Sequence, residues 1–285
     1  MLRTLSFICL AFGATAASAQ DFPVTVEHAF GETTIEERPE RVASVGWANH
    51  EVPLALGIVP VGFARASWGD DDGDGLLPWV IEKLDELDAE VPTLFDEGDG
   101  IDFEAVASTQ PDVILAAYSG LSQSDYETLS RIAPVIAYPE AAWTTTWREM
   151  IRQNAAGLGM AEEGDEMVAE IEERIASARE EYPELAGRTG MFVTHLDPRD
   201  LSTIGFYAAA DQRVQFLTDI GMATPQAVRE ASEAGKYSGR VSAERIDLFE
   251  DVDVVVTYGD QARLDELAKN PLIARFPAVA RGSVV

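Results

Sequence analysis

The chain has 285 residues, with 21 basic and 50 acidic side chains, and its formal net charge at pH 7 is -29. Such a chain is repelled by nucleic acid and by anionic membrane surfaces, which excludes both as partners. Its single cysteine, at position 9, excludes a disulfide framework and thiolate metal sites.

The first residues have the pattern of an export signal. Arg3 is the only charge in the segment, an apolar run extends from Leu5 to Phe12, and Ala17-Ser18-Ala19 supplies the small residues that signal peptidase accepts. The apolar run is shorter than the ~20 residues that a permanent membrane anchor needs. We therefore predict a signal peptide over residues 1–19, a mature chain that begins at Gln20, and a periplasmic location.

Cys9 lies inside this apolar run and is preceded by Ile8. A lipoprotein signal has a small residue directly before the modified cysteine and a full apolar region ahead of it. Neither feature is present, so we expect Cys9 to be removed with the signal and the mature protein to carry no lipid.

Strands and helices alternate through the N-terminal half. Predicted strands cover residues 41–46, 59–63, 111–116 and 134–138, and predicted helices cover 49–56, 103–108 and 126–132. The strands are continuous apolar runs and the helices are amphipathic. This combination is typical of a parallel sheet that is covered by helices on both faces.

A longer helix is predicted in the middle of the chain, over residues 162–183. Val168, Ile171, Ile175 and Ala178 recur at 3-4-3 spacing, so they form one apolar stripe, and charged residues fill the other face. A helix of this length spans about 30 Å. We expect it to link two lobes.

Alternation resumes after this helix, with strands predicted over residues 189–195 and 252–258 and helices over 212–220 and 243–249. The predicted class is α/β, with an N-terminal lobe over 20–161, the linking helix, and a C-terminal lobe over 184–285. Open α/β sheets bind ligands at the carboxyl ends of their strands. A ligand cleft is therefore expected between the lobes.

Enzyme signatures are missing from the sequence. It contains no Gly-rich loop ending in Gly-Lys-Ser/Thr, no Gly-x-Ser-x-Gly elbow and no His-Glu-x-x-His motif. We predict that the protein is not an enzyme. An exported α/β hydrolase or chelatase is the weaker alternative, because no set of nucleophile, base and orienting residue is evident.

Two groups of residues could supply metal ligands. Asp70, Asp72 and Asp74 resemble the start of a calcium loop, but its twelfth position is Ile81. We expect a solvated acidic loop there. Histidines at the predicted cleft could hold a bare metal ion, although such a site needs three or four ligands.

Aromatic residues follow several predicted strands. Trp47, Trp68, Tyr118 and Tyr258 stand at strand ends, whereas Tyr207 and Tyr237 are predicted in loops of the second lobe. Rigid aromatic side chains at a cleft suit a bulky, partly apolar ligand, and an arginine adds hydrogen bonds to anions or carbonyl oxygens. The predicted ligand-binding residues are Trp47, Trp68, Tyr118, Tyr207, Tyr237 and Arg240.

Five segments resemble the family of iron–siderophore and cobalamin ABC transporter binding proteins. They are TIEERPERVASV (34–45), EVPLALGIVPVG (51–62), DFEAVASTQPDVIL (102–115), YETLSRIAP (126–134) and NPLIARFPAV (270–279). The resemblance covers essentially all of the mature chain. It implies a class III periplasmic binding protein, with two Rossmann-like lobes joined by one long helix and limited closure of the lobes.

The resemblance also implies a function. Such a protein captures a ferric siderophore in the periplasm and delivers it to an inner-membrane permease with its ATPase. Hydroxamate-type members resemble the chain most, with tryptophans near Trp47 and Trp68 and an aromatic residue at Tyr118. We expect a monomer without a resident cofactor, because the siderophore itself saturates Fe³⁺. The alternative keeps the fold but binds haem, cobalamin or a bare metal ion through His50 and His195.

Two further expectations come from the resemblance. One exposed glutamate on each lobe meets the permease in the family, and the matching positions are Glu104 and Glu244. The family also continues past the final strand, residues 281–285, into a loop and a helix. We therefore expect the C-terminal lobe to lack its last helix.

Overall fold

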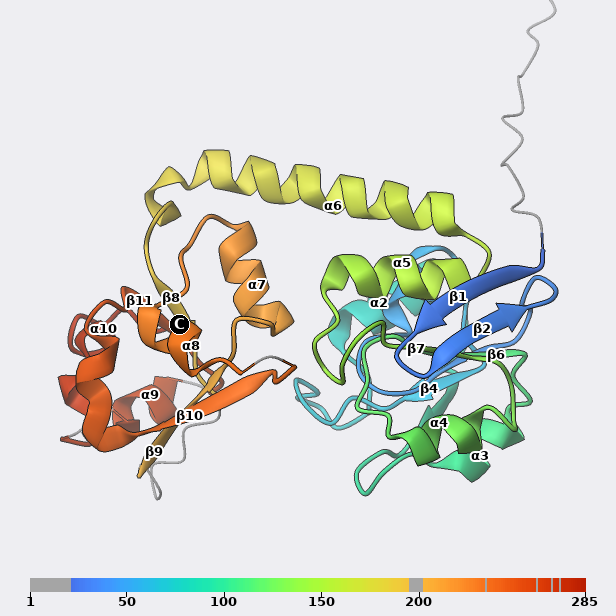
Figure 1. Ribbon diagram of the computed structural model, residues 1–285, viewed down its shortest axis with the longest axis horizontal. Coiled ribbons are helices and arrows are strands. Elements are labelled where there is room, and N and C mark those ends of the chain that lie inside the picture. The colour runs from blue at the N-terminus through green and yellow to red at the C-terminus, as the bar shows by residue number, and fades with distance from the viewer. Residues whose placement is uncertain (1–21, 195–201, 234, 260, 268, 272) are drawn as a thin grey trace, which may run out of the picture.

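The computed structural model describes residues 22–194, 202–233, 235–259, 261–267, 269–271 and 273–285. Two α/β lobes lie side by side, and one long helix runs past both of them (Figure 1). The predicted signal peptide with Cys9, and likewise His195, lie outside the described residues. Within these ranges no helix has the length and hydropathy to cross a bilayer.

The N-terminal lobe, called the N-lobe below, contains a hairpin and a five-stranded parallel sheet in the order β5-β4-β3-β6-β7. Its strands are β1 (Val24–His28), β2 (Gly31–Ile35), β3 (Val42–Ser44), β4 (Gly62–Ala64), β5 (Thr93–Phe95), β6 (Val113–Ala116) and β7 (Val135–Ala137). Its helices are α1 (Glu51–Ala55), α2 (Pro78–Glu86), α3 (Phe103–Ser108), α4 (Gln123–Leu129) and α5 (Trp147–Gly157).

Helices cover both faces of this sheet. Helices α2 and α5 lie on one side, and α3 and α4 lie on the other (Figure 1). All four residues of β6 are buried, as are those of β3 and β7. A strand that is buried on both faces has no polar alternation, which explains the continuous apolar runs in the sequence.

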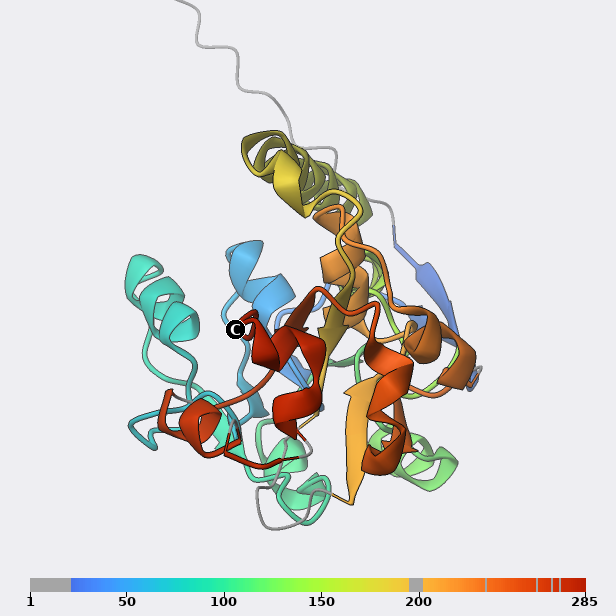
Figure 2. The same ribbon diagram turned by 90° about the vertical axis from the view of Figure 1, so that its left-hand side faces the viewer.

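Helix α6 (Ala161–Glu181) links the lobes and stands over them in the turned view of Figure 2. Its first half packs against α5 so closely that a Cβ atom on Gly164 would lie 2.6 Å from the Cβ atom of Ala155. The predicted apolar stripe is present, but only Val168 is buried, while Ile171 and Ile175 are partly exposed. The first half of α6 therefore packs on the N-lobe, whereas none of the residues 171–181 in its second half is buried.

The C-terminal lobe, called the C-lobe below, pairs β8 with β11 in parallel and β9 with β10 antiparallel. Its strands are β8 (Gly190–Phe192), β9 (Thr203–Tyr207), β10 (Ser238–Ser242) and β11 (Val254–Val256). Its helices are α7 (Gln212–Asp219), α8 (Gln226–Ala231), α9 (Gln261–Leu267) and α10 (Pro277–Ala280), with 3₁₀ turns η1 (Pro183–Leu185), η2 (Ala243–Phe249) and η3 (Ile273–Arg275).

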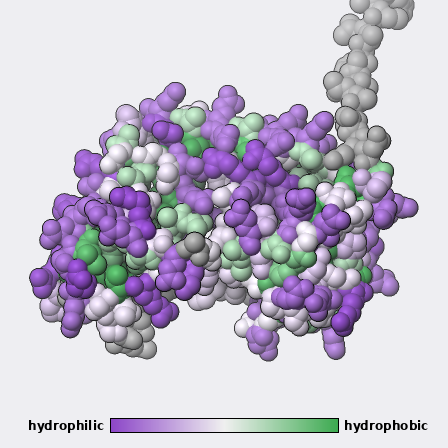
Figure 3. Space-filling model, in the orientation of Figure 1, coloured by the Kyte–Doolittle hydropathy of each residue, from purple (hydrophilic) through white to green (hydrophobic). Residues whose placement is uncertain are grey.

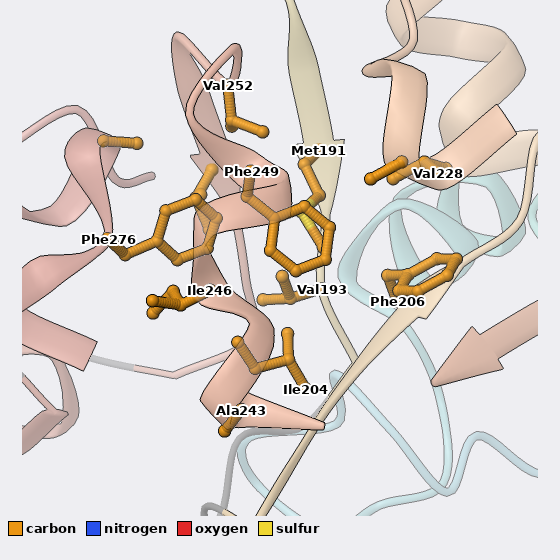
Figure 4. Packing of buried hydrophobic residues seen from close by; sticks show 13 residues of the cluster. Met191, Val193, Ile204, Phe206, Val228, Ala243, Ile246, Phe249, Val252 and Phe276 are labelled. Atoms are coloured by element: carbon orange, nitrogen blue, oxygen red, sulfur yellow. The ribbon is translucent and has the colours of Figure 1, made fainter. Parts of the chain in front are cut away.

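Aromatic rings fill the centre of the C-lobe. Phe206 from β9, Phe249 from η2 and Phe276 beside α10 converge there with aliphatic side chains (Figure 4). The Phe206 and Phe249 rings meet edge to face, with centroids 6.4 Å apart. This core holds the carboxyl end of β9 in place, where the candidate site begins.

The α/β class and the linking helix are confirmed, but several elements were not predicted. Residues 24–35 form a hairpin, 93–95 form the edge strand β5, and 203–207 with 238–242 form the β9–β10 ribbon. Tyr207 therefore ends a strand, so its assignment to a loop was wrong, and Arg240 lies in β10. The predicted helix at 243–249 is a 3₁₀ segment with a kink at Arg245.

Candidate functional site

The order of the N-lobe strands places a switch point between β3 and β6. The chain runs from β3 outward through β4 to β5, and then returns to the other side of β3 with β6. Ligands of open α/β sheets bind at the carboxyl ends of the strands at such a point. Trp47 follows β3 and Tyr118 follows β6, so the sequence placed both residues at this edge.

Backbone geometry ties these two strand ends together. The Trp47 N–H donates to the Tyr118 carbonyl at 3.2 Å. Gly46 has a φ of 75°, and a Cβ atom there would lie 2.8 Å from both the Tyr118 carbonyl oxygen and the Ser119 Cβ atom. Only glycine combines this backbone conformation with such a close approach.

The Asn49 side chain forms hydrogen bonds with the backbone of both strand ends. Its amide nitrogen donates to the carbonyls of Val45 and Tyr118 at 2.8 and 2.9 Å, and its oxygen accepts the Tyr118 N–H at 2.9 Å. The Asn154 amide donates to that same oxygen at 3.0 Å. Because Asn49 is fully buried, these bonds fix the backbone that presents Tyr118.

An ion pair between a buried aspartate and a partly exposed arginine forms the facing part of the C-lobe. The Arg213 guanidinium donates through Nε and Nη2 to the two oxygens of Asp211, each at 2.7 Å. Asp211 also caps α7 by accepting the backbone N–H of Arg213 at 2.9 Å. Burial lowers the pKa of Arg213, but the bonds and charge of Asp211 outweigh it and raise this pKa above its usual range.

Tyrosine rings surround this arginine. The guanidinium carbon lies 3.6 Å from the Tyr207 ring centroid, and Arg213 Nη1 donates to the Tyr258 hydroxyl at 3.1 Å. Phe192 packs edge-on against Tyr207 with ring centroids 5.5 Å apart. A stacked, bidentately held guanidinium is a rigid hydrogen-bond donor.

Tyr118 brings the two lobes together. It belongs to the N-lobe, but it lies close enough to Asp211, Gln212 and Arg213 of the C-lobe for these residues to shift its pKa. Burial, followed by the negative charge of Asp211, raises the pKa of the Tyr118 hydroxyl to about 12. Burial also raises the pKa of Tyr207. Both hydroxyls stay protonated at neutral pH, and little of either residue is exposed, 6 % of Tyr118 and 8 % of Tyr207.

A second contact between the lobes lies beside α6. The indole N–H of Trp147 and Nη1 of Arg148, both on α5, each donate to the Asp219 carboxylate on α7 at 2.9 Å. Arg148 Nε also donates to Glu172 on α6 at 2.7 Å. A capping box fixes the start of α5, so these donors are held at the helix end. This contact sets the spacing between α5 and α7.

The other predicted aromatic residues differ in exposure. Trp68, on the segment between β4 and α2 that extends toward the C-lobe in Figure 1, is 63 % exposed. Trp47 is half-buried. It packs against two groups of buried apolar side chains, one that includes Met150 of α5 and one that includes Val80 of α2, so it also contributes to packing. Tyr237 is 40 % exposed and directly precedes β10.

Arg240 shares a face with Tyr207. It pairs with Gly205 across the β9–β10 ribbon, and Tyr207 is two residues along the same strand. Side chains two residues apart point to the same side of a strand. Arg240 therefore extends the face that Tyr207 and Arg213 begin, and it remains exposed.

His50, which the alternative ligand class would use as a metal ligand, is buried. Its ring stacks on Phe63 with centroids 4.2 Å apart, and only 7 % of the residue is exposed. His50 directly precedes α1, and its side chain packs into the N-lobe core beside Phe63. His50 is therefore not placed as a ligand of a metal ion at the junction.

In the acidic loop, the carboxylates accept hydrogen bonds from backbone N–H groups of the same loop. Asp70 accepts the N–H groups of Gly73 and Gly75, each at 2.7 Å, and Asp74 accepts that of Leu76 at 2.8 Å. One oxygen each of Asp70, Asp72 and Asp74 lies within 4.8 Å of the others. Such internal hydrogen bonds are typical of a solvated acidic loop.

The two predicted docking glutamates occupy equivalent positions. Glu104 is exposed in the first turn of α3, which precedes β6, and Glu244 is exposed in the first turn of η2, which precedes β11. Both turns are capped by the preceding side chains, Asp102 and Ser242. Each glutamate therefore lies in the first turn of a short helical segment that precedes a parallel strand of its lobe.

Two surface cavities lie away from the junction. One, of about 640 Å³, is an open hollow beside the β1–β2 hairpin, lined by His28 and Glu140 among others. The other, of about 210 Å³, lies in the C-lobe between β11 and α10. Neither contains a predicted ligand-binding residue. Hydrophilic side chains cover most of the face seen in Figure 3.

Asp211, Arg213 and Trp143 were missed by the sequence reasoning. Trp143 packs edge-on against Tyr118, with ring centroids 5.3 Å apart. It lies in a loop without periodicity, so no pattern marked it. Arg213 carried a signal: a cation in the first turn of a helix opposes the helix dipole, which favours anions there.

Residues 42–285 match the model of the family described as periplasmic binding protein. The crystal structure of PiaA from Streptococcus pneumoniae TIGR4 in complex with ferrichrome is 42% identical, with a TM-score of 0.86, and the alignment covers 92% of this chain and 87% of that one.

Two curated Escherichia coli proteins are also similar. The ferric enterobactin-binding periplasmic protein FepB of strain CFT073 is 24% identical over 298 residues, which cover 95% of this chain and 86% of FepB. The Fe(3+) dicitrate-binding periplasmic protein FecB of strain K12 is 29% identical over 184 residues, which cover 63% of this chain and 57% of FecB. Since the family model spans both lobes, the chain belongs to the periplasmic binding protein family.

Proposed function

We propose that this protein is the substrate-binding component of an ABC importer and that it captures a ferric siderophore of the hydroxamate type. The observation that carries the proposal is the junction of the lobes, where Tyr118 at the sheet switch point lies near enough to the Arg213–Tyr207 stack for the charge of Arg213 to act on its hydroxyl. The likeness to PiaA in complex with ferrichrome supports the ligand class.

The chemistry of the junction suits such a ligand. Hydroxamate complexes present oxygen atoms and an apolar periphery, which match protonated tyrosines, a rigid arginine and aromatic faces. The siderophore's own oxygens hold Fe³⁺, so the protein needs no resident cofactor and supplies no metal ligand. Binding and release, without catalysis, are then the whole task of the protein.

Location and partners follow from the same proposal. The protein is exported by the signal over residues 1–19, works in the periplasm as a monomer without lipid, and hands its ligand to the permease and ATPase. The names of FepB and FecB describe periplasmic proteins, which supports this location.

A ligand panel tests the proposal directly. Quenching of tryptophan fluorescence is measured with ferrichrome, ferric enterobactin, haem, cobalamin and Zn²⁺. We expect saturable binding of ferrichrome and weaker or no binding of the others. Tight binding of haem, cobalamin or Zn²⁺ without binding of a ferric siderophore would replace the proposal with the alternative ligand class.

Trp68 is expected to contribute to affinity but not to stability, because it is largely exposed. Changing Trp68 to Ala should cost about 2 kcal/mol of binding free energy, roughly thirtyfold in the Kd for ferrichrome. The matched control is Trp79→Ala, an exposed tryptophan on α2 away from the strand ends. Equal affinities of the wild type and Trp68→Ala would remove Trp68 from the site.

Glu104 and Glu244 are proposed to dock on the permease. The double variant Glu104→Ala with Glu244→Ala should reduce ferrichrome uptake by cells that express the permease, while the purified protein keeps its Kd for ferrichrome. The control variant Glu127→Ala with Glu230→Ala removes one exposed glutamate per lobe elsewhere. Unchanged uptake by the first variant would contradict the docking role, and a weakened Kd would assign these residues to the fold or the site.

A further inference from the structure

Glu97 is a carboxylate at the sheet edge that the site described above does not use. It lies two residues beyond the end of β5, and its two oxygens are 3.0 and 3.2 Å from the backbone nitrogen of Gly46. Gly46 directly precedes Trp47 and lies against Tyr118 and Ser119. The Glu97 side chain therefore reaches from the edge strand to the switch point.

This carboxylate is partly removed from water but is not neutralised by a cation. None of the ion pairs within the described ranges includes Glu97. Burial raises its pKa to about 7, and the Gly46 N–H acts in the opposite direction. In the facing lobe, Arg213 is engaged with Asp211, and the exposed Arg240 on the β9–β10 ribbon forms no ion pair with Glu97 among the described residues. Above pH 7, where Glu97 is mostly ionised, it therefore places a negative charge at the switch point.

We propose that Glu97 selects ligands by charge, accepting a cationic group carried by a ferric siderophore and disfavouring anionic complexes. The inference rests on the proposed function and narrows its ligand to cationic or uncharged complexes. An opposite charge brought to a partly desolvated carboxylate is screened less by salt than one at the surface. The preference therefore acts locally and adds to the long-range effect of the net charge of -29.

A purely structural role makes a different prediction. If Glu97 only holds the Gly46 amide, its charge is irrelevant and any loss affects all ligands alike. Glu97→Gln keeps an oxygen that accepts the Gly46 N–H and removes the charge. Asp96→Asn is the matched control, because Asp96 is an exposed neighbouring carboxylate that likewise accepts a backbone N–H, from Gly98.

The experiment compares two ferric hydroxamates at pH 8, where Glu97 is ionised. Ferrichrome is uncharged, and ferrioxamine B carries one free ammonium group. We expect Glu97→Gln to raise the Kd for ferrioxamine B about tenfold or more, and that for ferrichrome less than twofold. Asp96→Asn should change neither value. Glu97→Gln should be at least as heat-stable as the wild type at pH 8, because burial disfavours the ionised form.

The possible results separate the selection role from the proposed function. Equal losses for both ligands, or an unchanged Kd for ferrioxamine B, would overturn the selection role and leave the proposed function intact. Wild-type protein that binds ferrichrome but not ferrioxamine B would do the same. Wild-type protein that binds neither complex would overturn both.

Discussion

Replacing Arg213 with alanine is expected to destabilise the protein by about 3–5 kcal/mol, because it leaves a buried carboxylate without its counter-ion. Asp211 is fully buried, and both of its oxygens accept hydrogen bonds from the guanidinium. The measurement is urea unfolding of the ligand-free protein, followed by tryptophan fluorescence. A change of less than about 1 kcal/mol would show that Asp211 does not depend on Arg213.

The same substitution should abolish ferrichrome binding, and a double variant separates the two effects. Asp211→Asn with Arg213→Met removes the buried charge and its partner together, and the thioether still packs on the Tyr207 ring. We expect this variant to recover most of the lost stability, because a neutral pair needs no ionic compensation. Ferrichrome affinity should stay lost. Recovery of affinity together with stability would exclude Arg213 from ligand contact.

How far the sequence predicts this architecture depends on the kind of signal. The buried strands β3, β6 and β7 are continuous apolar runs, and α6 has a helical stripe over many turns, so both were located closely. The short edge strand β5 and the β9–β10 ribbon are partly exposed. Their residues lack a regular pattern, because neighbouring strands rather than periodicity determine them.

The residues of the candidate site likewise differ in whether the sequence marks them. Trp47 and Tyr118 were found because they directly follow strands that the sequence marks clearly. Arg213 and Glu97 were not found, since each acquires its role from a partner that is distant in space or set by tertiary packing. His50 illustrates the opposite error. It was named as a metal ligand of the alternative ligand class, whereas packing on Phe63 buries it.

The buried His50 predicts a specific loss of stability in acid. Burial lowers the pKa of its imidazole from 6.5 to about 4, so between these values the unfolded chain binds a proton that the folded protein excludes. Stability must then fall as the pH decreases from 6.5 to 4. At 1.36 kcal/mol per pKa unit, this single histidine removes about 3 kcal/mol by pH 4.

The test compares the pH dependence of unfolding in the wild type and in His50→Gln. The variant should be less stable at pH 8, because it loses the contact with the Phe63 ring, but its free energy of unfolding should fall by about 3 kcal/mol less than that of the wild type between pH 7 and pH 4. Other titrating groups are common to both proteins and cancel in this difference.

His28→Gln is the matched control: burial also lowers the pKa of His28, but that side chain accepts the Phe30 N–H and hydrogen-bonds to Thr33. We expect a smaller change there. Parallel profiles for the wild type and His50→Gln would mean that the folded protein admits a proton to His50, and the stacked, neutral imidazole in the core would then be wrong.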